Sequence, residues 1–303
     1  MYKYLSFLLG MLSIFSLLQA EKKEDRKQIY AFGQNPIDVV IVSHPKDKIT
    51  LDFCVKGIRE NGKNVRRVIV VSSEKLTDNA EWFDEKKFPF TKGEVALAIG
   101  RGSKSRSTDF FERTNRGAGW YYQQLLKLYS PFVIPKISSN VLVLDADTVF
   151  MNPVDFVNAQ GGGLFCVSHF VGKEAYFKHA ERLVPGYKRI YPEVYSVCHH
   201  MLFQMPILKD LFKTVEKDHR KDFWVAFCHA VDIKANKKGA SEYEIYYNYA
   251  LRHTDQVALR DLMWANSSHL SDLPYYQRDG YHFVSFHTYM KGKWPSAYQH
   301  EHN

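Results

Sequence analysis

The sequence predicts an α/β fold built on a parallel sheet, and two patterns carry that prediction. The first is a β-α-β unit, in which strands over residues 37–43 and 65–72 flank a helix over 51–60 that Thr50 caps. The second is the apolar run 141–144, which has the length and β-branched content of a strand buried on both faces. Strands that alternate with helices are typical of parallel sheets.

Apolar segments further along the chain extend this pattern. Strands are expected over 163–169 and 201–204, and helices over 206–217 and 223–231. Loops of this second half would face a ligand bound at the sheet, so a second ligand is expected to bind there.

Composition and charge indicate a globular protein with acidic partners. The 303 residues are 45% hydrophobic and 15% aromatic, which is ample for a sizeable core. The formal charge of +8 and the pI near 9.1 suit nucleotide phosphates or anionic lipids. Basic residues do not form runs with interleaved aromatic residues, which argues against nucleic acid as a partner.

The first 36 residues have the pattern of a leader and a linker. Within residues 1–20, Lys3 precedes an apolar segment that is short for a membrane span, and Ala20 is a small residue at a plausible cleavage point. A cleaved signal peptide and a short membrane anchor both stay open, and so does the side of the membrane. Either one places the chain at a membrane or in the secretory pathway. Charged residues 21–36 are expected to form a linker before a single domain over 37–303.

The cysteines and the paired histidines lack the spacing of a metal site. The four cysteines are widely spaced without a Cys-x-x-Cys pair, so free buried thiols are expected, with disulfides as the alternative in an oxidising compartment. For the pair of His199 and His200, a structural role is favoured over a metal site.

The apolar run 141–144 leads directly into Asp145 and Asp147, with Ala146 between them. Side chains alternate along a strand, so both carboxylates are expected to point the same way. Ligands bind outside the carboxyl ends of strands in open α/β sheets, and hard carboxylate oxygens suit Mg²⁺ or Mn²⁺. The sequence therefore predicts a cation site here, and an ordinary strand-to-loop cap is the alternative.

A predicted helix that carries polar residues precedes this strand in the sequence. Residues 117–129 are expected to form a helix that stops at Ser130 and Pro131. Gln124 and Lys127 lie on this helix and would face a nucleotide sugar at the neighbouring strand end. The alternative is a helix with one solvated face.

Two more segments are candidates for the donor side. Residues 43–47 follow the first strand, where a nucleotide base would sit at a strand end, unless the segment is a plain turn. Residues 100–107 form a Gly/Ser-rich stretch that carries Arg101, Lys104 and Arg106. It is expected to be a loop, either folded over a diphosphate or mobile and solvated.

The segment around Glu242 contains two acidic residues at a predicted helix start. Ser241 and Glu244 have the spacing of a capping box, which gives Glu244 a structural role. Glu242 then occupies the first helical position, from which it would project beyond the helix end toward an acceptor. A catalytic Glu244, or a purely structural pair, stays open.

The helix that contains Trp120, Tyr121, Gln123 and Gln124, together with the Asp-x-Asp strand, resembles the nucleotide-sugar glycosyltransferases of the GT-A fold. It is most similar to little-characterised bacterial and viral glycosyltransferase-like proteins with a Trp-Tyr-x-Gln-Gln helix before that strand, over about residues 37–295. The resemblance implies a GT-A-type, Rossmann-like, mixed and mainly parallel sheet flanked by helices. It also implies a UDP- or GDP-sugar donor, Mn²⁺ or Mg²⁺ as cofactor, and a glycan or lipid-linked hydroxyl acceptor.

The resemblance also assigns roles to residues. Asp147 would ligate the metal, and Asp145 would contact the ribose and the metal shell. Glu242 would be the general base of an inverting transfer. A strand over 281–286 precedes a stretch that resembles the end of glycogenin-like transferases with its parts in altered order. There His287 would be a third metal ligand and Lys293 a diphosphate contact.

Two other classes of protein stay open. Asp145 also begins an Asp-x-Asp-x-Thr/Val string, as in haloacid-dehalogenase-like phosphatases, where the first Asp attacks phosphate. The string would normally open its domain, whereas here two strands precede it. The second class is a non-catalytic, membrane-tethered carbohydrate-binding protein. The sequence favours an enzyme, a metal-dependent glycosyltransferase.

Overall fold

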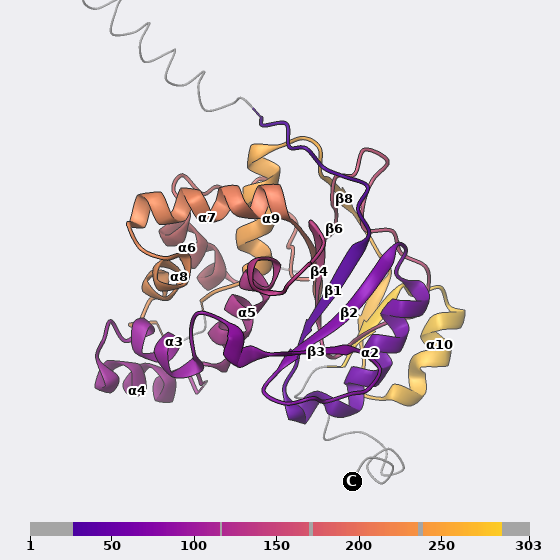
Figure 1. Cartoon of the computed structure of the whole chain (residues 1–303), viewed down its shortest axis with the longest axis horizontal. Helices are drawn as coiled ribbons and strands as arrows, with labels where there is room; N and C mark the ends of the chain where they lie inside the picture. The colour runs from indigo at the N-terminus through magenta and orange to yellow at the C-terminus, as the bar shows by residue number, and fades with distance from the viewer. Residues whose placement is uncertain (1–26, 116, 170–171, 236–238, 287–303) are drawn as a thin grey trace, which may run out of the picture.

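The computed structural model describes residues 27–115, 117–169, 172–235 and 239–286. A five-stranded sheet lies at its centre, with strands in the order β3-β2-β1-β4-β7 (Figure 1). These strands are β1 (Ile37–Val42), β2 (Val65–Ser72), β3 (Glu81–Asp84), β4 (Asn140–Asp145) and β7 (His200–Gln204). Only β7 runs antiparallel to its neighbour. The predicted α/β fold with a mixed, mainly parallel sheet flanked by helices is confirmed.

Helices cover both faces of this sheet (Figure 1). One face carries α2 (Lys48–Asn61), and α10 (Leu273–Arg278) lies beyond it. On the opposite side lie α3 (Lys92–Ile99), α4 (Lys104–Arg113), α5 (Gly119–Val133), α6 (Glu174–Leu183), α7 (Met205–His219), α8 (Phe223–Ala230) and α9 (Glu242–His253). Short 3₁₀ turns occur at Pro45–Asp47, Glu85–Lys87 and Leu270–Asp272.

Two smaller sheets continue the structure. The strands β5 (Thr148–Phe150), β10 (Phe283–Ser285) and β9 (Trp264–Asn266) form one, and β6 (Leu164–Cys166) pairs in parallel with β8 (Ala258–Arg260). A two-residue turn separates β4 from β5, so the chain leaves the central sheet directly after Asp145.

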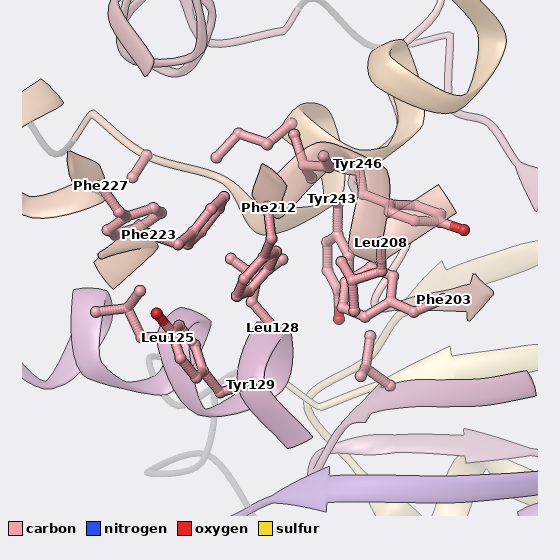
Figure 2. Close-up of a cluster of buried hydrophobic side chains, with 14 of the residues drawn as sticks. Leu125, Leu128, Tyr129, Phe203, Leu208, Phe212, Phe223, Phe227, Tyr243 and Tyr246 are labelled. Atoms are coloured by element: carbon pink, nitrogen blue, oxygen red, sulfur yellow. The ribbon is translucent and has the colours of Figure 1, made fainter. Parts of the chain in front are cut away.

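Alternating burial explains why β4 is apolar throughout. Val141 and Val143 belong to the hydrophobic cluster under α5 and α9, whereas Leu142 and Leu144 belong to the cluster under α2. Both faces of the strand are therefore buried, as in parallel sheets generally. Aromatic rings fill much of the first cluster, where Phe212 and Phe223 stack with ring centroids 3.9 Å apart (Figure 2).

Two helix boundaries differ from the sequence prediction. The first helix begins at Lys48, and Thr50 lies inside it, where its Oγ1 donates to the Asp47 carbonyl at 3.0 Å. The helix α5 continues through Pro131 to Val133 rather than stopping before it. Proline lacks an N–H, so Pro131 cannot bond to the Lys127 carbonyl, and the helix ends two residues later.

The remaining elements lie close to their predicted positions. The expected strands over 163–169 and 281–286 are shorter, as β6 and β10, and the expected loop over 100–107 contains the start of α4 with Ser103 as its N-cap. In the described part of the predicted linker, Tyr30 is buried and its hydroxyl donates to Asp210 at 2.8 Å. All four cysteines are buried and free, as expected.

The predicted leader lies outside the described residues. Within the part of the chain that is described, no helix is long and apolar enough to cross a membrane.

Candidate active site

We use the word crevice for the place at the carboxyl ends of β1 and β4, where the strand order reverses. From β1 the chain moves outward to β2 and β3 and then returns to β4 on the other side of β1, so the direction of the connections reverses between these two strands. Such switch points are the usual ligand sites of open α/β sheets. Val42, the last residue of β1, pairs with Asp145, the last residue of β4. Asp145 therefore lies at the crevice.

Asp147 is positioned by a turn rather than by the strand. Because β4 ends at Asp145, the alternation that the sequence suggested does not extend to Asp147. The Asp147 carbonyl accepts a hydrogen bond of 2.8 Å from the Phe286 amide, which ties the turn to the end of β10. The two aspartates thus share the end of one strand, but the pleat of that strand does not set their relative orientation.

A buried ion cluster surrounds Asp145. We use this name for Lys127, Asp145, Glu242 and Tyr243, which come from α5, β4 and α9. The Lys127 ammonium contacts Asp145 Oδ1 and donates to Glu242 Oε1 at 2.7 Å and to the Tyr243 hydroxyl at 2.9 Å. The Tyr243 hydroxyl donates to Asp145 Oδ1 at 3.1 Å. Three distant segments therefore meet at one cation.

The cluster reaches solvent on the Asp145 side. The side chains of Lys127 and Glu242 are 3% and 5% exposed, against 23% for Asp145. His199 precedes β7 and approaches this more open side, with its Nδ1 3.4 Å from Asp145 Oδ2. The Asp145 amide also donates to the His199 carbonyl at 2.9 Å. Asp145 therefore links the buried charges to the crevice.

Burial and charge pairing act in opposite directions on the acidic groups of the cluster. Burial raises the pKa of Asp145, but Lys127 and His199 outweigh it and hold the pKa well below its ordinary value. For Glu242, burial outweighs the attraction of Lys127, and the pKa is raised. Burial also disfavours the charged form of Lys127, yet the two carboxylates raise its pKa well above the ordinary value. Glu242 is thus the stronger proton acceptor of the two carboxylates.

Gln124 fixes the start of α9 at the cluster. Its Nε2 donates to the Ala240 carbonyl at 3.2 Å, and its Oε1 accepts from the Glu242 amide at 3.1 Å. The Trp120 indole donates to the same Ala240 carbonyl at 3.3 Å. Of the two helix residues expected at the donor, Lys127 contacts Asp145, whereas the Gln124 amide is bonded to the backbone that carries Glu242.

Glu244 has a separate set of partners. Ser241 caps α9, with its Oγ accepting from the Glu244 amide at 3.4 Å. The predicted reciprocal capping box does not form, because the Glu244 carboxylate instead accepts from the Ser196 amide at 2.7 Å and from Asn248 at 3.1 Å. Glu244 therefore anchors the segment that leads to His199. It has a structural role, as predicted, but through bonds to Ser196 and Asn248 instead of a capping box.

The two other predicted donor segments have different environments. Arg101 donates to the carbonyls of Cys228 at 3.0 Å and Val231 at 3.3 Å, and so caps the end of α8. Ser43, at the end of β1, has a buried hydroxyl with no hydrogen-bond partner among the described residues. His44 caps the following 3₁₀ turn by accepting from the Lys46 amide at 3.3 Å. A polar ligand in the crevice would supply the missing partner of Ser43.

The chemistry of the residues at the crevice suits a hard cation in part. Asp145 Oδ1 is already bonded to Lys127 and Tyr243, and Oδ2 has the longer contact with His199. The described ranges contain no group of three or more His, Cys, Asp or Glu side chains able to hold one ion. The expected third ligand, His287, and the expected phosphate contact, Lys293, lie outside those ranges. Asp145 and Asp147 supply the oxygen ligands that Mg²⁺ and Mn²⁺ prefer.

Sequence reasoning did not assign His199 and Tyr243 to the site. His199 has a φ of 64°, a left-handed conformation that turns the chain at the start of β7, and no sequence pattern indicated it. Its neighbour His200 is buried against Phe150 and Phe283, and burial lowers the pKa of His200 to about 3, in agreement with a structural role. For Tyr243, the available signal was its position directly after Glu242.

Comparisons with known proteins show a family and a distant likeness to solved structures. The model of a family described as "Family of unknown function (DUF6492)" matches residues 49–284. No curated protein matches the chain. Among solved structures, the apo structure of the WbbM bifunctional glycosyltransferase aligns with a TM-score of 0.42 and 12% sequence identity. The alignment covers 86% of this chain and 47% of that one, so the chain spans about half the length of that protein.

Proposed function

The chain belongs to the DUF6492 family of unknown function, and we propose that it is a metal-dependent glycosyltransferase. It moves a sugar from a UDP- or GDP-sugar donor to a hydroxyl of a glycan or lipid-linked acceptor. The observation that carries this proposal is the placement of Lys127 between Asp145 and Glu242 at the crevice of β1 and β4. The arrangement puts an ionised carboxylate and a basic carboxylate side by side, at the place where α/β sheets bind ligands.

The donor uses the open end of the cluster, which the acceptor also reaches. Asp145 and Asp147, together with His287, would hold Mn²⁺ or Mg²⁺, and Lys293 would contact the diphosphate. When bound, the ion supplies a Lewis acid that neutralises charge on the leaving diphosphate. Lys127 keeps Asp145 ionised, because it lowers the pKa of that carboxyl. The Ser43 hydroxyl, which has no hydrogen-bond partner within the described part of the chain, supports a polar group of the donor at the end of β1.

The acceptor side uses Glu242. An acceptor hydroxyl must lose its proton as it attacks the sugar, and a carboxylate with a raised pKa accepts that proton more readily than an ordinary one. Lys127 holds the Glu242 carboxylate at 2.7 Å and Gln124 holds its backbone, so the base has a fixed position. A base that activates the acceptor hydroxyl implies direct displacement at the anomeric carbon. Inversion is therefore the proposed stereochemistry.

Thermal melting of the full chain tests the donor site. The chain is melted with a panel of nucleoside diphosphates, each with and without Mn²⁺, and separately with beryllofluoride and with free sugars. A ligand that binds only the native state raises the melting temperature, by an amount that follows its concentration and affinity. We expect a rise that needs both a nucleotide and the ion. Stabilisation by a phosphate mimic such as beryllofluoride, without any by nucleotides, would overturn the proposal in favour of a phosphatase with Asp145 as nucleophile.

A non-catalytic carbohydrate-binding protein makes a different prediction in the same experiment. Such a protein would be stabilised by free sugars but by no combination of nucleotide and metal. That outcome would also overturn the proposed transfer reaction.

A further inference from the structure

We propose that a cleft next to the ion cluster binds an uncharged saccharide as the acceptor, an inference that rests on the proposed function. The cleft has a volume of about 440 Å³. Trp264, Tyr281 and Met263 give it an apolar lining, and Ser168, His169 and Asp261 provide its polar groups. A volume of this size falls in the range of small-molecule sites, which combine a mostly apolar wall with a few polar groups.

The cleft is joined to the candidate active site through two contacts. The ring of Trp264 meets the imidazole of His199 edge to face, with centroids 5.2 Å apart. His199 Nδ1 in turn lies 3.4 Å from Asp145 Oδ2. A molecule bound in the cleft therefore lies against Trp264, which contacts His199, and His199 contacts Asp145.

The tryptophan is held in a fixed orientation. Trp264 lies on β9 and stacks on Phe283 of β10, with an angle of 6° between the ring planes. Such a ring offers a rigid apolar surface with one polar N–H, and this matches a sugar, whose ring has apolar C–H faces and a rim of hydroxyl groups.

The polar groups of the cleft select against an anionic ligand. Asp261 and His169 form an exposed pair at 3.1 Å, with side chains 71% and 69% exposed. Asp261 accepts hydrogen bonds and would bind sugar hydroxyls, whereas it would repel phosphate and carboxylate groups. Among the described residues that line the cleft, none is Lys or Arg, so the donor diphosphate has no cation to pair with there. The cleft is therefore assigned to a neutral acceptor.

Ligand-observed NMR on the full chain tests this assignment. The probes are neutral methyl glycosides of glucose, galactose, mannose and N-acetylglucosamine, and glucuronic acid is the acidic comparison. We expect saturable binding of at least one neutral glycoside and weaker binding of glucuronic acid. Asp261→Asn, at an exposed position, should weaken the neutral glycoside about tenfold, as expected for a lost hydrogen bond to a charged group.

Two further variants complete the experiment. Trp264→Phe keeps an aromatic ring of smaller area and should weaken binding, whereas Asp78→Asn, at an exposed aspartate outside the cleft, should leave it unchanged. The inference is overturned if no neutral glycoside binds, if glucuronic acid binds better, or if both cleft variants bind as the wild type does. Nucleotide-dependent melting of the same samples separates the two proposals. Stabilisation by nucleotide without glycoside binding refutes the cleft alone, and the reverse result refutes the transfer reaction.

Discussion

Lys127 and Glu242 are separated by 115 residues in the sequence, yet their charged atoms lie 2.7 Å apart. The same ammonium contacts Asp145, so two buried carboxylates share one cation. Removing one partner of a buried ion pair leaves an uncompensated charge, which costs more than the pair itself contributes. The cluster is thus as important for stability as for the chemistry proposed at its open side.

Replacing Lys127 by Met should therefore destabilise the protein strongly. We expect the free energy of unfolding to fall by about 3–5 kcal/mol, the usual cost of breaking a buried ion pair, as measured by urea unfolding. Lys56→Met is the matched control, because the exposed Lys56 ammonium lies 4.0 Å from Glu60 in a surface pair. The control should change stability by less than about 1 kcal/mol. A Lys127→Met variant as stable as the control would contradict the burial of the cluster.

The pH dependence of transfer should report Glu242. Only the ionised carboxylate accepts a proton, so kcat/KM should fall as the pH decreases through the pKa of Glu242. Burial raises that pKa, so the acid limb should lie above the ordinary glutamate value of about 4.3. The measurement is kcat/KM between about pH 4 and pH 8. An acid limb at or below the ordinary value would argue against Glu242 as the base.

Gln124 and Gln123 should behave differently although they are neighbours on α5. Gln124→Ala removes two hydrogen bonds that hold the start of α9, so we expect kcat to fall with little change in nucleotide affinity. The free energy of unfolding should decrease by about 1–3 kcal/mol, because buried backbone groups lose their partners. Gln123→Ala is the control and should retain kcat. Equal effects of the two variants would remove the positioning role of Gln124.

Glu242 and Glu244 offer a second matched comparison. Glu242→Gln should reduce transfer by about 10²-fold or more, the usual cost of losing a general base, with nucleotide affinity retained. Glu244→Gln should mainly reduce stability, because its carboxylate holds Ser196 and Asn248. Urea unfolding and transfer assays on both variants check this division. The reverse pattern would move the base to Glu244.

The variant Asp147→Asn tests the contribution of Asp147 to the metal site. Asp147→Asn replaces one carboxylate oxygen by an amide nitrogen and removes the negative charge, so Mn²⁺-dependent binding of the nucleotide should be lost while the fold stays intact. Calorimetry of nucleoside diphosphate binding, with and without Mn²⁺, provides the measurement. Unchanged affinity in the presence of the ion would remove Asp147 from the site.

The sequence predicted the features that depend on local pattern. The strand β4 was predictable because both of its faces are buried, which makes its sequence apolar throughout. Asp145 was predictable as a site residue because it follows that apolar run directly. The segment that begins α9 was visible from Ser241, whose side chain caps the helix. These features follow from residues that are neighbours in the chain.

Features that depend on packing between distant elements were not predictable in the same way. The pairing of Lys127 with Glu242 requires α5 and α9 to pack against each other, and no local pattern encodes that contact. The carboxylate of Glu244 does not complete the predicted capping box, because it accepts a buried hydrogen bond from the Ser196 amide of a distant loop. His199 joined the site through an unusual left-handed turn that residue type alone does not indicate.

The most direct test of the proposed function is the release of nucleoside diphosphate from UDP- and GDP-sugars by the full chain with Mn²⁺. The assay is run with and without neutral saccharides as acceptors. The account predicts release by the wild type and a loss of about 10²-fold or more in Glu242→Gln, with nucleotide binding retained in that variant. A wild-type protein that binds nucleotide and ion but releases no diphosphate from any donor would contradict it, and so would full activity of Glu242→Gln.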